Sequence, residues 1–115
     1  MIGGKPAPTL ERRGAFGDRC VIALSGEWDL YNRPELASAL ITTIDEGERR
    51  LVLDLTAATF IDSSILGALI EARKRVRPEG GEIVVVADTP EIRRVFEITG
   101  FENVFSLYER LDDLR

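Results

Sequence analysis

The chain has 115 residues, 44% of them hydrophobic, a size and composition that fit one soluble globular domain with a single core. Its 20 acidic against 15 basic residues give a net charge of −5, which opposes the counterion release on which nucleic acid binding depends. Because the chain has no histidine, Ser-His-Asp and Cys-His catalytic arrangements cannot be built, and zinc sites lose their commonest nitrogen ligand.

The first predicted elements are two strands near the N-terminus. Residues 10–13 can form a short strand, and after a turn at "GAFGD" a stronger strand covers about residues 20–27. Their close spacing predicts an antiparallel pair. Cys20 opens the second strand, where we interpret it as a small packed residue and not as a reactive thiol.

An amphipathic helix is predicted in "YNRPELASALITTIDEG". Asn32 is the expected N-cap, Glu35 stands where it would complete a capping box, and Gly47 stands where a C-terminal glycine is usual. The residues expected on its buried face are Leu36, Leu40, Ile41 and Ile44. The following "RRLVLDL" predicts a buried strand over residues 51–55, in which we expect Asp54 to make a local hydrogen bond.

The second half of the chain continues to alternate helix and strand. "DSSILGALIEARKRV" predicts a helix that ends at Pro78, and "EIVVVA" predicts a strand covered on both faces. "DTPEIRRVFEITG" predicts a helix with Thr89 as N-cap and Gly100 as its stop. "NVFSL" then predicts a last short strand, and "YERLDDLR" a short terminal helix. The residues expected on the core stripe of the first of these helices are Leu66, Leu69, Ile70 and Val76.

Strands that alternate with helices imply right-handed crossovers and parallel strands with helices packed against them. With the leading hairpin, the sequence predicts a single α/β domain over residues 9–115, built on a mixed, mostly parallel sheet of about five strands with about four helices. Residues 1–8 are expected to be loose.

Several functional classes lack their signatures. No glycine-rich phosphate loop is present, so we expect neither an enzyme nor a bound cofactor or metal. The longest uncharged run, residues 36–44, is far shorter than the roughly 20 residues of a membrane span. The N-terminus also lacks the apolar core of a secretory signal. Together these observations predict a cytoplasmic protein without membrane insertion. The basic cluster Arg73, Lys74, Arg75 and Arg77 is interpreted as a complement to the dipole of its helix.

The triplet Asp62-Ser63-Ser64 lies where a strand turns into a helix, at the edge of the sheet where α/β proteins commonly place their sites. Asp and Ser are preferred N-caps, so capping alone explains the triplet. The alternative is that one hydroxyl accepts a phosphoryl group, because a helix N-terminus suits an anion.

A family resemblance favours the second interpretation. "LVLDLTAATFIDSSILGALIEA" resembles the signature of the STAS domain of bacterial anti-sigma factor antagonists, a strand with an internal Asp followed by D-S-[ST]-G-L and a helix. "VIALSGEWDLYNRPELASAL" is similar to the earlier strand of the same family, which ends in G-E-x-D before a helix that opens around P-E-L. The resemblance covers roughly residues 8–113 and implies the STAS fold.

The resemblance also implies a function and a set of site residues. Family members switch partners: the unmodified domain binds an anti-sigma factor that is also a serine kinase and so frees a sigma factor, phosphorylation ends the binding, and a phosphatase restores it. The phosphorylated serine matches Ser63, while Trp28 takes the place of an aliphatic residue and is expected to pack. The implied partner-binding residues are Asp29, Asp62, Ser63, Ser64, Ile65 and Leu66. For Asp29, a role as turn former is an open alternative.

One position departs from the family pattern. Ile65 replaces the glycine that follows the two hydroxyls, and its place beside Leu66 predicts a side chain at the exposed edge of the buried face, in contact with the partner. A branched side chain there also favours an alternative, an accessory subunit that docks to a transporter or a lipid-trafficking ATPase complex without phosphorylation. A third hypothesis is a small-ligand sensor, for which the sequence has no pocket motif.

Overall fold

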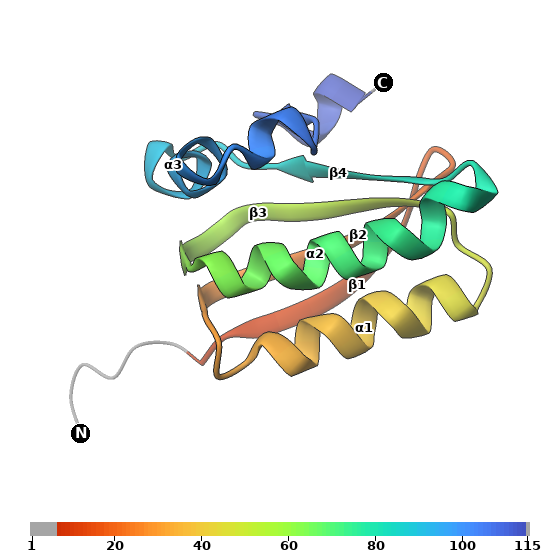
Figure 1. Cartoon of the computed structure of the whole chain (residues 1–115), viewed down its shortest axis with the longest axis horizontal. Coiled ribbons are helices and arrows are strands. Elements are labelled where there is room, and N and C mark those ends of the chain that lie inside the picture. Colours follow the sequence, from red (N-terminus) through yellow and green to blue (C-terminus); the bar gives the residue numbers. More distant parts are fainter. Residues whose placement is uncertain (1–6, 115) are drawn as a thin grey trace.

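The structure is a computed structural model that describes residues 7–114, and one sheet of five strands organises it (Figure 1). Strand order in the sheet follows chain order, with β1 antiparallel to β2 and all later neighbours parallel. The predicted mixed, mostly parallel sheet of about five strands is therefore confirmed. The strands are β1 (Thr9–Phe16), β2 (Arg19–Trp28), β3 (Arg50–Ile61), β4 (Glu82–Val86) and β5 (Leu107–Tyr108).

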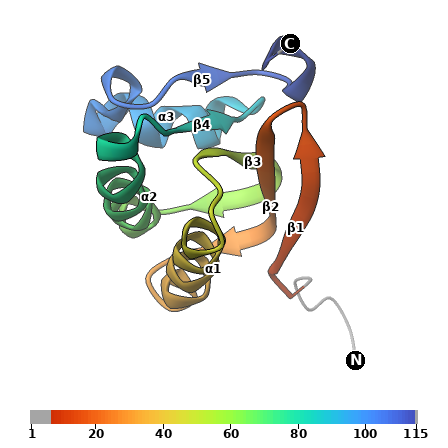
Figure 2. The same cartoon turned by 90° about the vertical axis from the view of Figure 1, so that its right-hand side faces the viewer.

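Helices α1 (Arg33–Asp45) and α2 (Ser63–Val76) lie side by side on one face of the sheet, and α3 (Pro90–Thr99) lies beyond the end of β4 (Figures 1 and 2). Right-handed crossovers between neighbouring parallel strands place successive helices on the same face. Within the described residues there are three α-helices where about four were predicted. The expected terminal helix is instead the 3-10 helix η3 (Leu111–Leu114).

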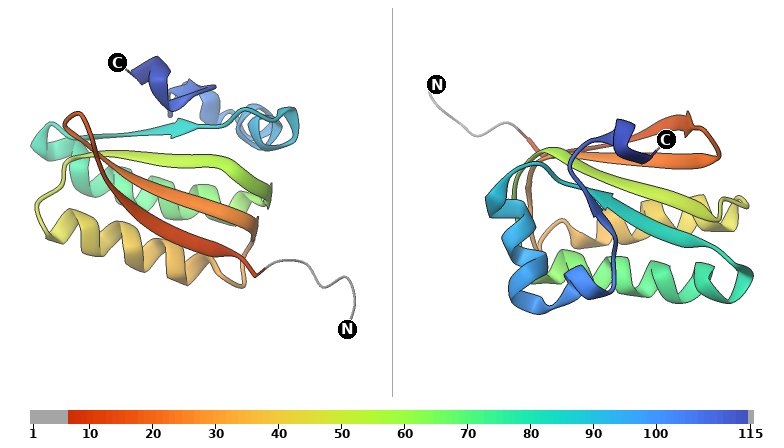
Figure 3. Two further views of the ribbon diagram at one scale, coloured as in Figure 1. Left: turned by 180° about the vertical axis from the view of Figure 1, so that it is seen from behind. Right: turned by 90° about the horizontal axis from the view of Figure 1, so that it is seen from above.

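Alternation along the strands divides the buried residues between the two faces. On the helix side, leucine and isoleucine side chains of β2 and β3 pack against α1 and α2, and Trp28 is fully buried, with Nε1 donating to Ser25 O at 2.9 Å. The opposite face carries a smaller valine cluster, over which the C-terminal segment folds (Figure 3). This cluster is Val21, Val52, Val84 and Val86, with Phe16, Tyr108, Leu111 and Leu114 packed against it.

Three strands differ in length from their predictions. β1 was predicted over residues 10–13 but covers Thr9–Phe16. β3 was predicted over residues 51–55 but continues to Ile61, because its pairing with β2 extends to Ile61. β5 was predicted to begin at Asn103 but has only two residues. Phe105 leaves the strand path and enters the core, where its ring meets that of Phe96 edge to face, with centroids 6.4 Å apart.

The predicted helix ends are partly confirmed. Gly100 ends α3 with φ of 78°, a left-handed conformation that glycine adopts without steric cost. Thr89 occupies the N-cap position of α3, but its side chain makes no capping hydrogen bond. Pro78 does not stop the helical path outright, since it lies in the 3-10 turn η1 (Arg77–Glu79) that continues α2.

Two smaller expectations concern the N-terminal half. Cys20 is buried, as predicted for a packed strand residue. The expected loose segment, residues 1–8, lies outside the described residues for its first six positions; Pro8, which is described, packs against Gly26. Among residues 7–114, no helix combines the length and the apolar character that crossing a bilayer requires.

Candidate functional site

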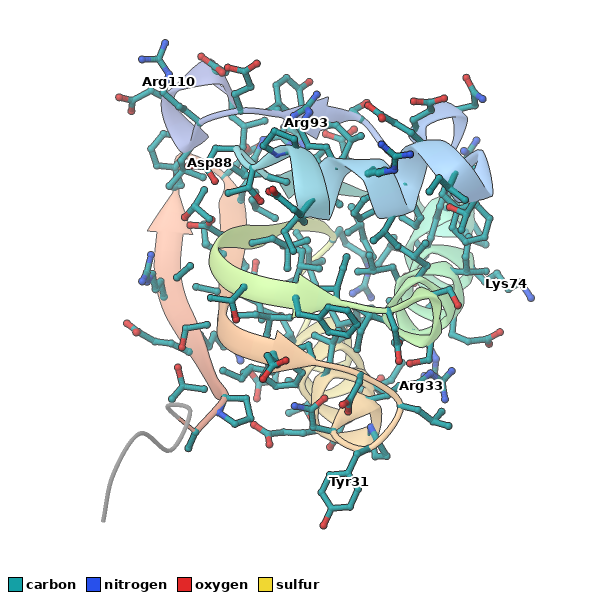
Figure 4. The ribbon with its side chains drawn as sticks, turned by 90° about the vertical axis from the view of Figure 1, so that its left-hand side faces the viewer. Tyr31, Arg33, Lys74, Asp88, Arg93 and Arg110 are labelled. Atoms are coloured by element: carbon teal, nitrogen blue, oxygen red, sulfur yellow. The ribbon has the colours of Figure 1, made fainter. Side chains whose placement is uncertain are left out.

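The candidate site lies at the edge of the sheet where the parallel strands end, the edge that faces the viewer in Figure 4. Two connections meet there. The loop of residues 29–32 joins β2 to α1, and Asp62 joins β3 to α2. The amide of Asp62 donates to Trp28 O at 3.2 Å, so the two connections begin from directly neighbouring strand ends.

The carboxylate of Asp62 ties these two connections together. One oxygen, Oδ1, accepts a hydrogen bond from the amide of Ser64 at 2.9 Å and another from the Ser64 hydroxyl, and so caps α2. The other oxygen, Oδ2, accepts from the amide of Leu30 at 3.2 Å. The predicted role of Asp62 as N-cap is confirmed, and its second role as an anchor for the β2–α1 loop is new.

The two hydroxyls of the triplet differ in what they do. The Ser64 side chain is half-buried and committed to Asp62. Ser63 is exposed, and among residues 7–114 its hydroxyl has no hydrogen-bond partner. A hydroxyl that must leave an existing hydrogen bond is less available for transfer chemistry. The structure therefore distinguishes two serines that the sequence alone leaves equivalent.

The loop before α1 is closed by its own side chains. Asn32 Oδ1 accepts from the amide of Asp29 at 2.8 Å, and Asn32 Nδ2 donates to Glu27 O at 3.0 Å. Asn32 occupies the N-cap position as predicted, but the predicted capping box is wrong, because the Asn32 side chain is bound to the loop and accepts no hydrogen bond from an amide of the helix. Asp29 Oδ1 accepts from the amide of Tyr31 at 2.9 Å, which makes Asp29 a turn former at the edge of the site.

Ile65 is the clearest correction to the sequence prediction. Its side chain was expected at the exposed edge of α2, but it is 0% exposed and belongs to the core, as does Leu66. The reason is that α2 packs against both the sheet and α1, so its buried face is wide and includes small residues. That face consists of Ile65, Leu66, Ala68, Leu69, Ala72 and Val76, while Ile70, predicted in the stripe, is only partly buried.

Exposed apolar side chains lie in the two chain segments that meet at this site, the loop of residues 29–32 and the end of β3, and sequence reasoning missed them. Leu30 is 70% exposed, Tyr31 is 94% exposed, and Phe60 is 46% exposed. Tyr31 points away from the body of the molecule in Figure 4. Exposed apolar residues that lie together are a feature of protein interaction sites. The sequence signal for Leu30 and Tyr31 is an apolar pair inside a turn, "DLYN", where polar residues are usual.

The exposure of Phe60 follows from the register of β3. Two register shifts between β2 and β3 each give β3 one residue more than its partner strand, and the second lies between the pairs Gly26–Ala58 and Glu27–Phe60. As a result Ala58 and Ile61 both face the core although three positions separate them, and Phe60 faces outward.

Arg33 is a second residue that sequence reasoning missed. It lies at the start of α1, and its Nε donates to Ser64 O at 3.0 Å. Its guanidinium passes over Gly67, where a Cβ would lie 3.5 Å from Nη2. Arg33 therefore fixes the first turn of α2 against the start of α1.

A buried carboxylate lies within the sheet, in β3. Asp54, the buried carboxylate of β3, accepts from the amide and hydroxyl of Thr56 at 2.9 and 2.8 Å and lies 3.6 Å from the Arg13 guanidinium, so it is a satisfied structural group as predicted. In the described part of the chain no three His, Cys, Asp or Glu side chains gather as a metal site would require.

Comparison with known proteins decides the family. The family model of the STAS domain matches residues 7–114. The chain belongs to the STAS domain family. The predicted STAS fold is thus confirmed, and Asp62-Ser63-Ser64 occupies the junction of β3 and α2 in this STAS domain.

Several relatives of this STAS domain are named as anti-sigma factor antagonists. BtrV of Bordetella bronchiseptica, which is named as a proposed anti-sigma factor antagonist, is 36% identical over 74% of this chain and 73% of its own length. The anti-sigma-B factor antagonist of Staphylococcus aureus is 28% identical over 76% of this chain and 82% of its own. The crystal structure of an anti-sigma factor antagonist from Mycobacterium paratuberculosis superposes on this chain with a TM-score of 0.84 and 32% sequence identity. The match covers 93% of this chain and 90% of that one.

Proposed function

We propose that this STAS domain is an anti-sigma factor antagonist that binds an anti-sigma factor with serine kinase activity, and that phosphorylation of Ser63 ends the binding. The observation that carries the proposal is the contrast between the two serines: Ser63 is exposed with an uncommitted hydroxyl, while Ser64 caps the helix through Asp62. The names of the relatives support the antagonist role.

The partner surface in this proposal is centred on Ser63 and differs from the one the sequence suggested. It consists of Ser63 with Asp62 and the exposed side chains of Leu30, Tyr31 and Phe60. Aromatic residues contribute much of the free energy of binding at protein interfaces, and Tyr31 offers a large contact area. Ile65 and Leu66 act only through the stability of α2, because neither side chain reaches the surface.

The proposed switch is electrostatic. A phosphoryl group adds a charge of about −1.5 to −2, and here it would stand one residue from the Asp62 carboxylate. The helix N-terminus tolerates that anion, so the domain stays folded while an acidic or desolvated contact with the partner becomes unfavourable. A phosphatase that removes the group would restore the apolar surface and the binding.

Mass spectrometry after incubation with ATP and each candidate serine kinase encoded near this gene tests the site of modification. We expect one phosphoryl group on the wild type and on Ser64→Ala, and none on Ser63→Ala. The Ser64 variant is the matched control, since it removes the neighbouring hydroxyl and one bond to Asp62. Modification that follows Ser64, or an unmodified wild type with every co-encoded kinase, would refute the phosphorylation step.

Calorimetry with the same partner tests the surface separately from the modification. Ser63→Ala should bind like the wild type and Ser63→Asp more weakly, while Tyr31→Ala should lose at least about tenfold in affinity, as truncation of an interface anchor does. If Ser63→Asp and Ser63→Ala bind equally, the electrostatic step is wrong. If the anti-sigma factor is not bound at all, docking to a transporter or ATPase complex without phosphorylation becomes the better hypothesis.

A further inference from the structure

A second candidate site lies at the opposite end of α2 from Ser63, the end that faces the viewer in Figure 2. A surface hollow of about 440 Å³ opens there between the last turn of α2, the first half of β4 and the segment before β5. Its lining is mainly polar and includes Arg73, Arg77, Ile83, Val104 and Ser106. The volume is within the range of about 300 to 1,000 Å³ that small-molecule sites have.

The cations at this end of α2 fall into two groups. Lys74 lies 3.5 Å from Glu71, and Arg75 lies 3.7 Å from Asp45, so each has an acidic partner. Arg73 and Arg77 line the hollow, and among the described residues neither side chain has an ion pair or a hydrogen bond. The dipole of α2 explains why cations lie at its C-terminus. It does not explain why Arg73 and Arg77, which have no acidic partner among the described residues, line the same hollow.

Arg73 and Arg77 are also one helical turn apart, so their side chains extend from the same side of α2. Like charges at this spacing repel each other in the absence of a counter-ion. An anion placed between the two guanidinium groups removes that repulsion, and guanidinium groups match the geometry of phosphate oxygens.

The backbone of β4 contributes a third feature. The amides of Val85 and Ala87 donate to Ser106 O and Tyr108 O, at 3.0 and 2.8 Å. Because alternate residues of a strand face the same neighbour, the amide of Ile83 points to this side as well. In the described chain the first β5 residue, Leu107, pairs with Val85, so β5 has no residue opposite Ile83. The edge of β4 is therefore open where it lines the hollow, close to the hydroxyl-bearing Ser106.

We propose that this hollow binds a phosphate ester, with Arg73 and Arg77 holding the phosphate oxygens and Ser106 and the Ile83 amide as further donors. The acidic residue in the lining, Glu82, does not oppose this, because its carboxylate is bound by Arg19 at 2.8 Å and by Arg50 at 3.0 Å. The site is independent of the partner surface around Ser63, which lies at the other end of the same helix.

The net charge of −5 works against general attraction of anions to this protein. A protein with a net negative charge repels anions at long range, so saturable binding of an anion must come from a local arrangement of donors. If anions were attracted nonspecifically to basic side chains, removal of any one arginine would lower the affinity equally. At a specific site, the loss of affinity depends on which arginine is removed.

Titration followed by NMR tests the site directly. ADP and pyrophosphate serve as soluble probes, and phosphatidylcholine vesicles with and without phosphatidylglycerol serve as the lipid probe. We expect saturable shifts of the amides of Ile83, Val84, Val104 and Ser106 with at least one probe. Arg73→Gln and Arg77→Gln should each weaken that binding by about tenfold or more, as loss of one ion pair to a ligand commonly does.

Arg75→Gln is the matched control, because it removes the same charge from the same helix end while Arg75 lies against Asp45. Its affinity should stay within about twofold of the wild type. Binding of ADP assigns the site to a free phosphate ester, and binding to the anionic vesicles alone assigns it to a lipid headgroup. Binding of pyrophosphate alone would overturn the ester in favour of an inorganic anion. The absence of saturable shifts with every probe, or an equal loss in Arg75→Gln, would overturn the proposal.

Discussion

Replacement of Ile65 by alanine tests the corrected placement of this side chain. The substitution removes three carbons from a position that is 0% exposed. At about 0.8 kcal/mol for each buried carbon, the transfer term is about 2.4 kcal/mol, and the cavity left between α2, the sheet and α1 adds to it. We therefore expect a loss of about 2 to 5 kcal/mol in the free energy of unfolding. A domain of this size has about 6 to 17 kcal/mol in total, so the variant should fold with visibly reduced stability.

Urea unfolding followed by circular dichroism measures the loss, with an unchanged slope as evidence that the unfolded states are comparable. Ile98→Ala is the matched control, since the same substitution on α3 affects a side chain that is 73% exposed and should change stability by less than about 0.5 kcal/mol. The folded fraction of Ile65→Ala should bind the partner like the wild type. A stability loss below about 1 kcal/mol, with affinity reduced, would return Ile65 to the surface and refute this packing.

Three further substitutions address single features. Asp62→Ala should cost about 1 to 2 kcal/mol in urea unfolding and Asp62→Asn clearly less, because the amide still offers an acceptor; equal costs would deny the cap. Gly81→Ala should cost about 1 to 3 kcal/mol, since its Cβ would lie 2.3 Å from Arg49 O, while Gly14→Ala, with no neighbour within 4 Å, should be nearly neutral. The hydrogen bond from Arg50 lowers the pKa of Glu82, so the ionised carboxylate stabilises the folded state above its ordinary pKa of 4.5, and this stabilisation is lost as the pH falls below that value. Glu82→Gln should therefore make the free energy of unfolding less dependent on pH in that acid range.

Periodicity predicted the sheet wherever a strand is regular and apolar. The valine run of β4 faces two clusters, as a strand covered on both sides requires, and the sequence marks it plainly. The second half of β3 reads "TAATF", and its two register shifts interrupt the alternation on which strand prediction depends. Phe105 resembles a strand residue in sequence, but its contact with Phe96 draws it into the core and shortens β5.

The candidate site was predictable as far as local rules reach. A helix start after a strand identified Asp62 and Ser63, because capping needs only neighbouring residues. Ile65 was misplaced because alanines were not counted in the buried face, although Ala68 and Ala72 let α2 approach its neighbours closely. The exposure of Leu30 and Tyr31 depends on how the β2–α1 loop closes, which combines local side-chain hydrogen bonds with a bond from the Leu30 amide to the distant Asp62.

The two oxygens of the Asp62 carboxylate serve two segments that are 32 residues apart in the chain, the start of α2 and the amide of Leu30. In a chimera between relatives, the loop of residues 29–32 and the residue at position 62 would therefore have to be exchanged together. A loop grafted alone onto a host without an acceptor there would leave an amide unpaired and its apolar side chains unanchored. For protein engineering, the surface beside Ser63 is one transferable unit made of two distant pieces of sequence.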